Sequence, residues 1–115
     1  MKNSPLMVKS KQFALDIIKV CNEVKKSKKE SVLTNQVLRS GTSIGANIRE
    51  AQYAHGRADF IAKLQIALKE SSETEYWREL LIASGYYDDV AILHKCIEVK
   101  RLLISSINTA KQNEK

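Results

Sequence analysis

The stretch LTNQVLRSGTSIGANIREA, residues 33–51, carries the clearest structural pattern in this chain of 115 residues. Its apolar residues recur at the three- and four-residue spacing of one helix face; they are Leu33, Val37, Ile44, Ile48 and Ala51. Gly41 and Gly45 stand four apart in this helix, although each glycine costs about 1 kcal/mol relative to alanine. Two glycines on one face predict that another backbone approaches closely there.

The same spacing predicts three further helices on either side of this one. We expect helices at about residues 5–26, 28–54, 57–84 and 89–110. One apolar row of the first is Phe13, Ile17, Val20 and Val24. The fourth has two such rows, Ile92, Cys96, Val99 and Leu103 in one and Leu93, Ile97, Ile104 and Ile107 in the other. The third helix has one row of Phe60, Leu64, Ala67, Ser71, Thr74, Trp77 and Leu81, and a second apolar row of Ile61, Leu68, Tyr76, Leu80 and Ala83.

Residues that suit helix ends lie between these segments. Pro5 after Ser4 fits a helix start, because proline at the first helical position loses no needed hydrogen bond. Ser27 and Glu30 stand three apart, as in a capping box that would open the second helix. Further end signals are Gly56 and Asp59 before the third helix, Gly85 after it, and Asp88 or Asp89 before the fourth.

Four glycines and one proline are too few for the turns of a sheet or barrel. Short connections between four long helices predict a single all-α domain, an up-and-down four-helix bundle over residues 1–115. The third and fourth helices have apolar faces wider than one seam needs. This width favours self-association, although long bundle helices are also apolar over a broad arc.

No apolar run reaches the roughly 18 residues that a membrane span needs. The lysine-studded N-terminal segment does not resemble a secretory signal, so we expect a cytoplasmic protein. Cys21 and Cys96 would pair only in an oxidising compartment, and buried free thiols are favoured.

The net charge of +6 is concentrated in residues 1–29, which contain eight lysines and only two acidic residues, Asp16 and Glu23. The candidate nucleic-acid-binding residues there are Lys9, Lys11, Lys19, Lys25, Lys26, Lys28 and Lys29. They would neutralise phosphates in a salt-sensitive way, or they form a solvated face that keeps the protein soluble. Interleaved aromatic residues would favour base stacking, but this segment holds only Phe13, on the apolar face.

The stretch LRSGTSIGANIREA, residues 38–51, resembles the signature of the bacterial four helix bundle proteins, also called 23S rRNA intervening-sequence proteins. The resemblance continues through ADFI at 58–61, IALKES at 66–71, ETEYW at 73–77 and Leu80–Leu81. It spans about residues 33–85, and the first and last helices match only in pattern. Gly56 departs from the serine cap expected at the third helix start.

The resemblance implies a four-helix subunit of a ring-like homopentamer and no assigned enzymatic activity. The ribosomal name reflects genes that sit inside insertions in large-subunit rRNA genes. A similar basic, pentameric accessory protein works with the reverse transcriptase of diversity-generating retroelements, which makes RNA, DNA or a nucleic-acid enzyme the expected partner.

A polar stripe follows the second helix at spacings of four, four and three; it consists of Arg39, Ser43, Asn47 and Glu50. Such a stripe is either a partner-binding site or a structural network completed by the third helix, through Glu73 and Thr74. Arg39 suits both roles, because its guanidinium forks between carboxylates or holds a phosphate.

The sequence predicts no catalytic residues, no metal site, no cofactor and no small-molecule substrate. Di-iron bundles place a glutamate three residues before a histidine, and neither His55 nor His94 has one there. Both cysteines fall on apolar rows, where thiols are usually inert.

The leading hypothesis is therefore a non-enzymatic, homo-oligomeric scaffold that engages nucleic acid, or a nucleic-acid enzyme, through its basic first helix. A protein–protein adaptor whose basic face meets an acidic partner is the alternative. An enzyme or small-molecule binder with a site in a bundle or ring cavity is a third, weaker hypothesis.

Overall fold

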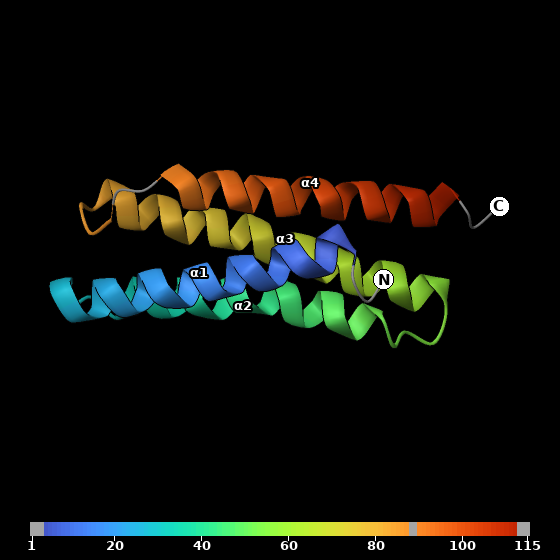
Figure 1. Cartoon of the computed structure of the whole chain (residues 1–115), viewed down its shortest axis with the longest axis horizontal. Helices are drawn as coiled ribbons and strands as arrows, with labels where there is room; N and C mark the ends of the chain where they lie inside the picture. The colour runs from blue at the N-terminus through green and yellow to red at the C-terminus, as the bar shows by residue number, and fades with distance from the viewer. Residues whose placement is uncertain (1–3, 88–89, 113–115) are drawn as a thin grey trace.

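The computed structural model describes residues 4–87 and 90–112. Within these ranges it contains four helices and no strand: α1 (Pro5–Lys28), α2 (Val32–Ala51), α3 (Arg57–Ala83) and α4 (Val90–Gln112). The all-helical class with four helices is confirmed for this part of the chain. Successive helices run in opposite directions, up and down, along a molecule of 51 × 21 × 20 Å (Figure 1).

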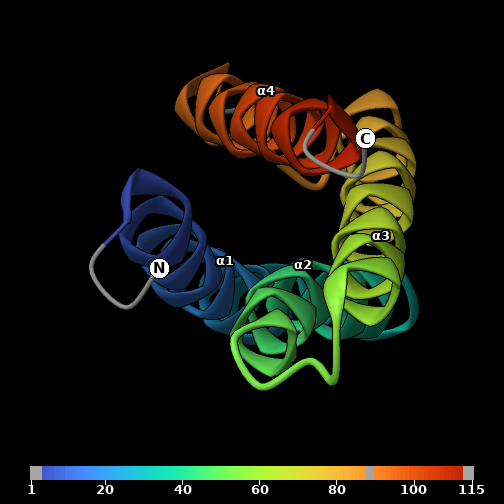
Figure 2. The same cartoon turned by 90° about the vertical axis from the view of Figure 1, so that its right-hand side faces the viewer.

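Each helix packs against two others, so that α1 also meets α4 (Figure 2). The α2–α3 contact is the most extensive and the α1–α4 contact the least. Two ion pairs bridge α1 and α4: Lys95 Nζ lies 2.6 Å from Asp16 Oδ2, and Lys9 Nζ lies 3.4 Å from Glu98 Oε1. The buried core between the helices includes Phe13, Ile44, Leu64 and Leu103.

The backbone neighbour predicted from the two glycines of α2 is found at Gly45, where it belongs to α1; at Gly41 the neighbour is a side chain of α1. A Cβ added at Gly41 would lie 3.1 Å from Cγ2 of Ile17, which is tighter than ordinary van der Waals contact. A Cβ added at Gly45 would lie 3.6 Å from the backbone oxygen of Ser10, at ordinary contact distance. The space beside Gly41 is therefore filled by Ile17, whereas an alanine fits at position 45.

The turn between α1 and α2 differs from the expected capping box. Ser27 stays within α1, and its hydroxyl donates to the carbonyl oxygen of Glu23 at 2.7 Å. Glu30 instead turns forward, and its carboxylate accepts from the backbone N–H groups of Leu33 and Thr34, both at 2.9 Å. As a result α1 ends at Lys28, beyond the expected residue 26, and α2 begins at Val32 instead of residue 28.

The residues of α3 that face the core differ at two positions from the first of the two predicted apolar rows. Trp77 is only half-buried at the edge of the core, against which it packs, and its Nε1–H donates to Glu73 at 2.9 Å. Arg78 occupies the core position and is buried. Phe60 is likewise only partly buried, and Ile61 takes the inner place. The remaining inner residues, Leu64, Ala67, Ser71, Thr74 and Leu81, are buried as predicted.

The other helix ends follow local chemistry. Ser4 caps α1 by accepting from the backbone N–H of Met7 at 3.2 Å. Gly56 precedes α3, and Asp59 reaches back to accept from the N–H of His55 at 3.1 Å. After α3, Gly85 adopts a φ of +81°, which glycine takes without penalty. The predicted cap at Asp88 or Asp89 lies outside the described residues, and α4 extends to Gln112, past the expected residue 110.

Candidate functional site

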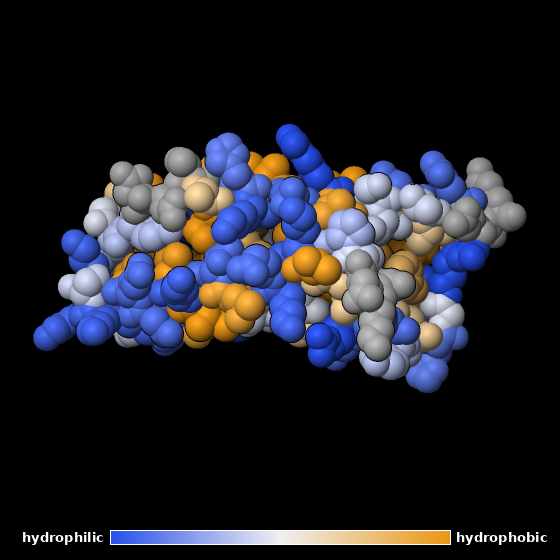
Figure 3. Space-filling model, viewed as in Figure 1, coloured by the Kyte–Doolittle hydropathy of each residue, from blue (hydrophilic) through white to orange (hydrophobic). Residues whose placement is uncertain are grey.

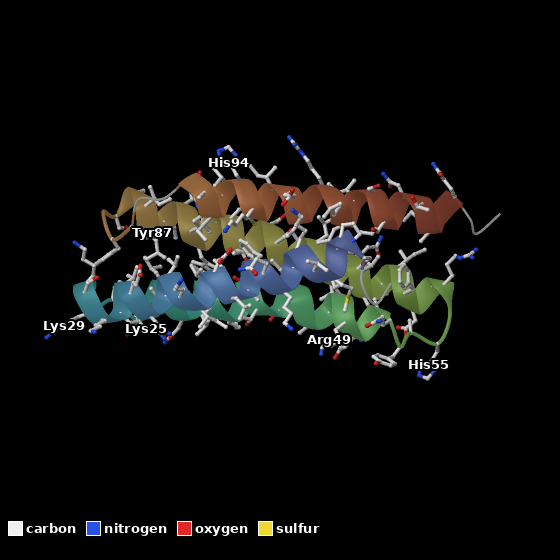
Figure 4. All side chains as sticks on the ribbon, viewed as in Figure 1. Lys25, Lys29, Arg49, His55, Tyr87 and His94 are labelled. Atoms are coloured by element: carbon white, nitrogen blue, oxygen red, sulfur yellow. The ribbon has the colours of Figure 1, made fainter. Side chains whose placement is uncertain are left out.

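Four of the seven candidate lysines gather where α1 ends and turns into α2. We call Lys25, Lys26, Lys28 and Lys29 the basic end; Figure 4 labels Lys25 and Lys29 there. Lys25 is half-buried and the other three are exposed. None of them forms an ion pair with another described residue. Their charges are therefore available to an outside anion.

Part of this charge has a structural use. The carbonyl groups at a helix C-terminus carry partial negative charge, and lysines in the last turn stabilise it. Lys25, Lys26 and Lys28 occupy the last turn of α1. Lys29 is different, because it follows the helix in the left-handed region at φ 55° and ψ 26°. Glycine suits that conformation better than lysine does.

The other three lysines are spread along α1 away from the basic end. Lys9 lies about 24 Å from Lys25 along the helix axis, from 16 residues at about 1.5 Å each, and it pairs with Glu98. Lys11 lines a small hollow between α1 and α2, of about 170 Å³, together with Arg49. Lys19 is exposed near Asp16, and its charge helps to lower the pKa of that carboxyl. The seven lysines are thus not one compact patch.

The polar stripe of α2 lies against the flank of α3. Arg39 forms ion pairs with Glu73 and with Glu70, whose Oε2 lies 3.4 Å from Nη1. Glu50 lies 3.4 Å from the ammonium of Lys63. The Ser43 hydroxyl and the Asn47 amide donate to carbonyl oxygens of their own helix. These contacts support the structural interpretation of the stripe, and the partner-binding interpretation remains a prediction.

Beneath this stripe a buried hydroxyl pair joins α2 to α3. The oxygens of Thr74 and Ser40 lie 2.9 Å apart, and both side chains are almost fully buried. The prediction that Thr74 would complete the Arg39 stripe is therefore replaced by a separate contact with Ser40. This pairing could not be predicted from the sequence, because serine and threonine hydroxyls also bond to carbonyl oxygens of their own helix.

Both cysteines are buried and neither forms a disulfide. Burial raises the pKa of Cys21 to about 11 and that of Cys96 to about 12. Each thiol lies near a backbone carbonyl oxygen, of Thr34 for Cys21 and of Ser71 for Cys96. Neutral, buried thiols of this kind are packing groups and not nucleophiles.

The turn between α3 and α4 adds two residues that the sequence analysis missed. A surface hollow of about 480 Å³ is lined by Lys28, Ile82, Gly85, Tyr86 and Tyr87. Figure 4 shows Tyr87 at the same end of the molecule as Lys25 and Lys29. The up-and-down topology was the available signal, because it places the first and third connections at one end.

A larger hollow of about 860 Å³ lies at the opposite end, between the end of α2, the start of α3 and α4. Its lining consists mostly of small and polar side chains, with Arg57 as the charged member among the described residues.

Across the described ranges, no three His, Cys, Asp or Glu side chains are grouped to hold a metal ion. No described helix is long and apolar enough to cross a membrane.

Acid is expected to destabilise the fold through Asp16 and Glu30. The hydrogen bond from Lys95 holds the pKa of Asp16 below its ordinary value of 3.8. Burial raises the pKa of Glu30, but the hydrogen bonds from Leu33 and Thr34 outweigh burial and leave it below 4.5. A carboxyl with a lowered folded pKa stabilises the protein above its unfolded pKa, and the benefit is lost as pH falls.

Urea unfolding at pH 7, 5, 4 and 3 should therefore show the free energy of unfolding falling below about pH 4.5. In the double variant Asp16→Asn, Glu30→Gln this fall should be shallower. An equally steep fall in the double variant would assign the acid sensitivity to other groups.

Comparisons with known proteins agree with this architecture. The model of the family described as 23S rRNA-intervening sequence protein matches residues 2–105, which include α1 to α3 and most of α4. A solved protein of unknown function from the S23 ribosomal protein family of Bacteroides thetaiotaomicron is 50% identical to this chain. The match has a TM-score of 0.87 and covers 89% of this chain and 97% of that one. No curated protein matches.

Proposed function

This chain belongs to the 23S rRNA-intervening sequence protein family, and from that premise we propose that it is a non-enzymatic, cytoplasmic scaffold that binds nucleic acid. The observation that carries the proposal is the basic end, four lysines without ion pairs among the described residues. Ammonium groups attract the phosphates of RNA and DNA and displace their counterions. A nucleic-acid enzyme carrying its RNA or DNA would meet the same surface.

We propose in addition that the scaffold is a homo-oligomer, a pentamer by its resemblance to the family. Three large apolar side chains lie exposed along one stripe of α1: Val8, Leu15 and Ile18. On the face seen in Figure 3, hydrophobic patches interrupt the hydrophilic surface over α1. Burial of such patches against a second copy is favourable. Several basic ends in one assembly would also strengthen a weak interaction through avidity.

Two measurements test these proposals. Fluorescence anisotropy with labelled RNA and DNA, single-stranded and duplex, should show binding that weakens with salt. Four neutralised phosphates give a slope of log K against log salt of about −2.8 to −3.6. Absence of binding at about 50 mM salt would reject the nucleic-acid role and direct attention to an acidic protein partner. Light scattering that reports a monomer at micromolar concentration would reject the oligomer.

Lys29→Gly is expected to change stability and binding in opposite directions. Glycine relieves the left-handed backbone of residue 29 and should stabilise the fold by about 0.5–1 kcal/mol. The same change removes one phosphate contact and should weaken binding about 5-fold at 0.1 M salt. Thermal unfolding and anisotropy on the same sample measure both effects. A stabilised variant with unchanged affinity would remove Lys29 from the binding surface.

A further inference from the structure

The hollow at the basic end combines two kinds of group that single-stranded nucleic acids require. Lys28, at the end of α1, lines it together with the aromatic residues Tyr86 and Tyr87 from the turn after α3. Its volume of about 480 Å³ falls within the roughly 300–1,000 Å³ typical of ligand pockets. Lys28 and the two tyrosines therefore line one hollow beside the other lysines of the basic end, although about 60 residues separate them in the sequence.

The end of α3 holds this surface in place. The N–H of Tyr86 donates to the carbonyl of Leu81, and that of Gly85 donates to the carbonyl of Ile82, both at 3.0 Å. These two bonds close the helix in the manner of a Schellman motif, with Gly85 in the left-handed conformation. The backbone of Tyr86 is thus tied to the last turn of α3.

The two tyrosines differ in exposure. Tyr87 is partly buried and packs against the hydrophobic core, so it forms a fixed wall of the hollow. Tyr86 keeps 36% of its surface exposed and counts among the large exposed hydrophobic residues. Tyr86 is therefore the more exposed aromatic side chain of the hollow.

We propose that the basic end binds single-stranded RNA or DNA in preference to duplex, with an unpaired base stacked on Tyr86 and the adjoining phosphates on the lysines. This inference rests on the proposed nucleic-acid function and specifies its ligand. Stacking on an aromatic side chain contributes to single-strand binding without requiring a particular sequence. The bases of a duplex are already stacked on each other and do not reach such a ring.

The test compares Tyr86→Leu with Tyr53→Leu. Tyr53 is 79% exposed and follows α2, at the opposite end of the molecule, so its loss is a matched control. The probes are a labelled single-stranded oligonucleotide of mixed sequence and its duplex of equal length. Wild type should prefer the single strand. Tyr86→Leu should weaken single-strand binding about 5- to 160-fold and leave duplex binding unchanged, whereas Tyr53→Leu should alter neither.

A second variant, Tyr86→Phe, keeps the aromatic ring and should retain single-strand affinity. It separates loss of stacking from a folding defect, which thermal unfolding also detects. If wild type binds both forms equally and Tyr86→Leu alters neither, the stacking inference is overturned and the proposed function stands. If wild type binds neither form at low salt, the proposed function itself fails.

Discussion

Replacement of all four lysines of the basic end by glutamine should weaken single-strand binding on the order of 600-fold at 0.1 M salt. For a single strand, the slope of log K against log salt is about −0.7 for each neutralised phosphate. Four contacts therefore contribute about 2.8 logarithmic units between 1 M and 0.1 M salt. Anisotropy titrations of wild type and of Lys25→Gln, Lys26→Gln, Lys28→Gln, Lys29→Gln across a salt series measure this loss directly.

The matched control replaces the three lysines that lie elsewhere on α1, as Lys9→Gln, Lys11→Gln and Lys19→Gln. One of them is paired with Glu98, and none adjoins the tyrosine hollow. This variant should lose far less affinity than the fourfold change and keep most of the salt slope. Equal losses in the two variants would show that overall charge, and not the basic end, governs binding. The fourfold variant also loses favourable charge at the end of α1, so its folding must be checked by circular dichroism.

Gly41→Leu is expected to reduce the free energy of unfolding by about 3 kcal/mol. The first carbon of any side chain at this position already lies 3.1 Å from Ile17, which is itself almost fully buried between the helices. The remaining carbons of leucine have no space unless α1 moves away from α2. Chemical denaturation of the variant measures the loss, and about 3 kcal/mol corresponds to roughly 12 °C in Tm for a domain of this size.

Gly45→Ala supplies the comparison within the same helix. Its added carbon would make an ordinary contact with the backbone oxygen of Ser10. The gain in helix propensity should leave the variant as stable as wild type or up to about 1 kcal/mol more stable. A stable Gly41→Leu protein would mean that the close approach of α1 and α2 does not depend on Gly41.

Local chemistry made most of the helix positions predictable. Pro5 and Gly85 act through their own backbones, so their effects depend little on the rest of the fold. Periodicity could not choose between Trp77 and Arg78, because the steps from Thr74 to Leu81 fit a helix through either residue. Hydrophobicity favoured the tryptophan, but the rotation of α3 about its own axis, as it packs against α2 and α4, buries the arginine.

Of the candidate site, the lysines could be predicted from the sequence and the tyrosines could not. The lysines form a local run, which a sequence shows directly. The nearness of Tyr86 to Lys28 depends on how α1 and α3 lie relative to each other, and no short motif records that. The Arg39–Glu73 ion pair could be predicted from the sequence, because both residues lie on the facing flanks of consecutive helices. The Ser40–Thr74 hydrogen bond beneath it could not be predicted in this way.

The directions of α1 and α4 have a practical consequence for immobilising the protein or fusing it to a reporter. α1 begins about 36 Å from the basic end, from 24 residues at about 1.5 Å each, and α4 runs away from the tyrosine turn (Figure 1). The N-terminal end of α1 and the C-terminal end of α4 therefore both point toward the end of the rod opposite the basic end (Figure 1). A sensor surface, a bead or a fused reporter tethered there would leave the lysines and tyrosines facing solution. Tethering through the turn between α1 and α2 would instead block them.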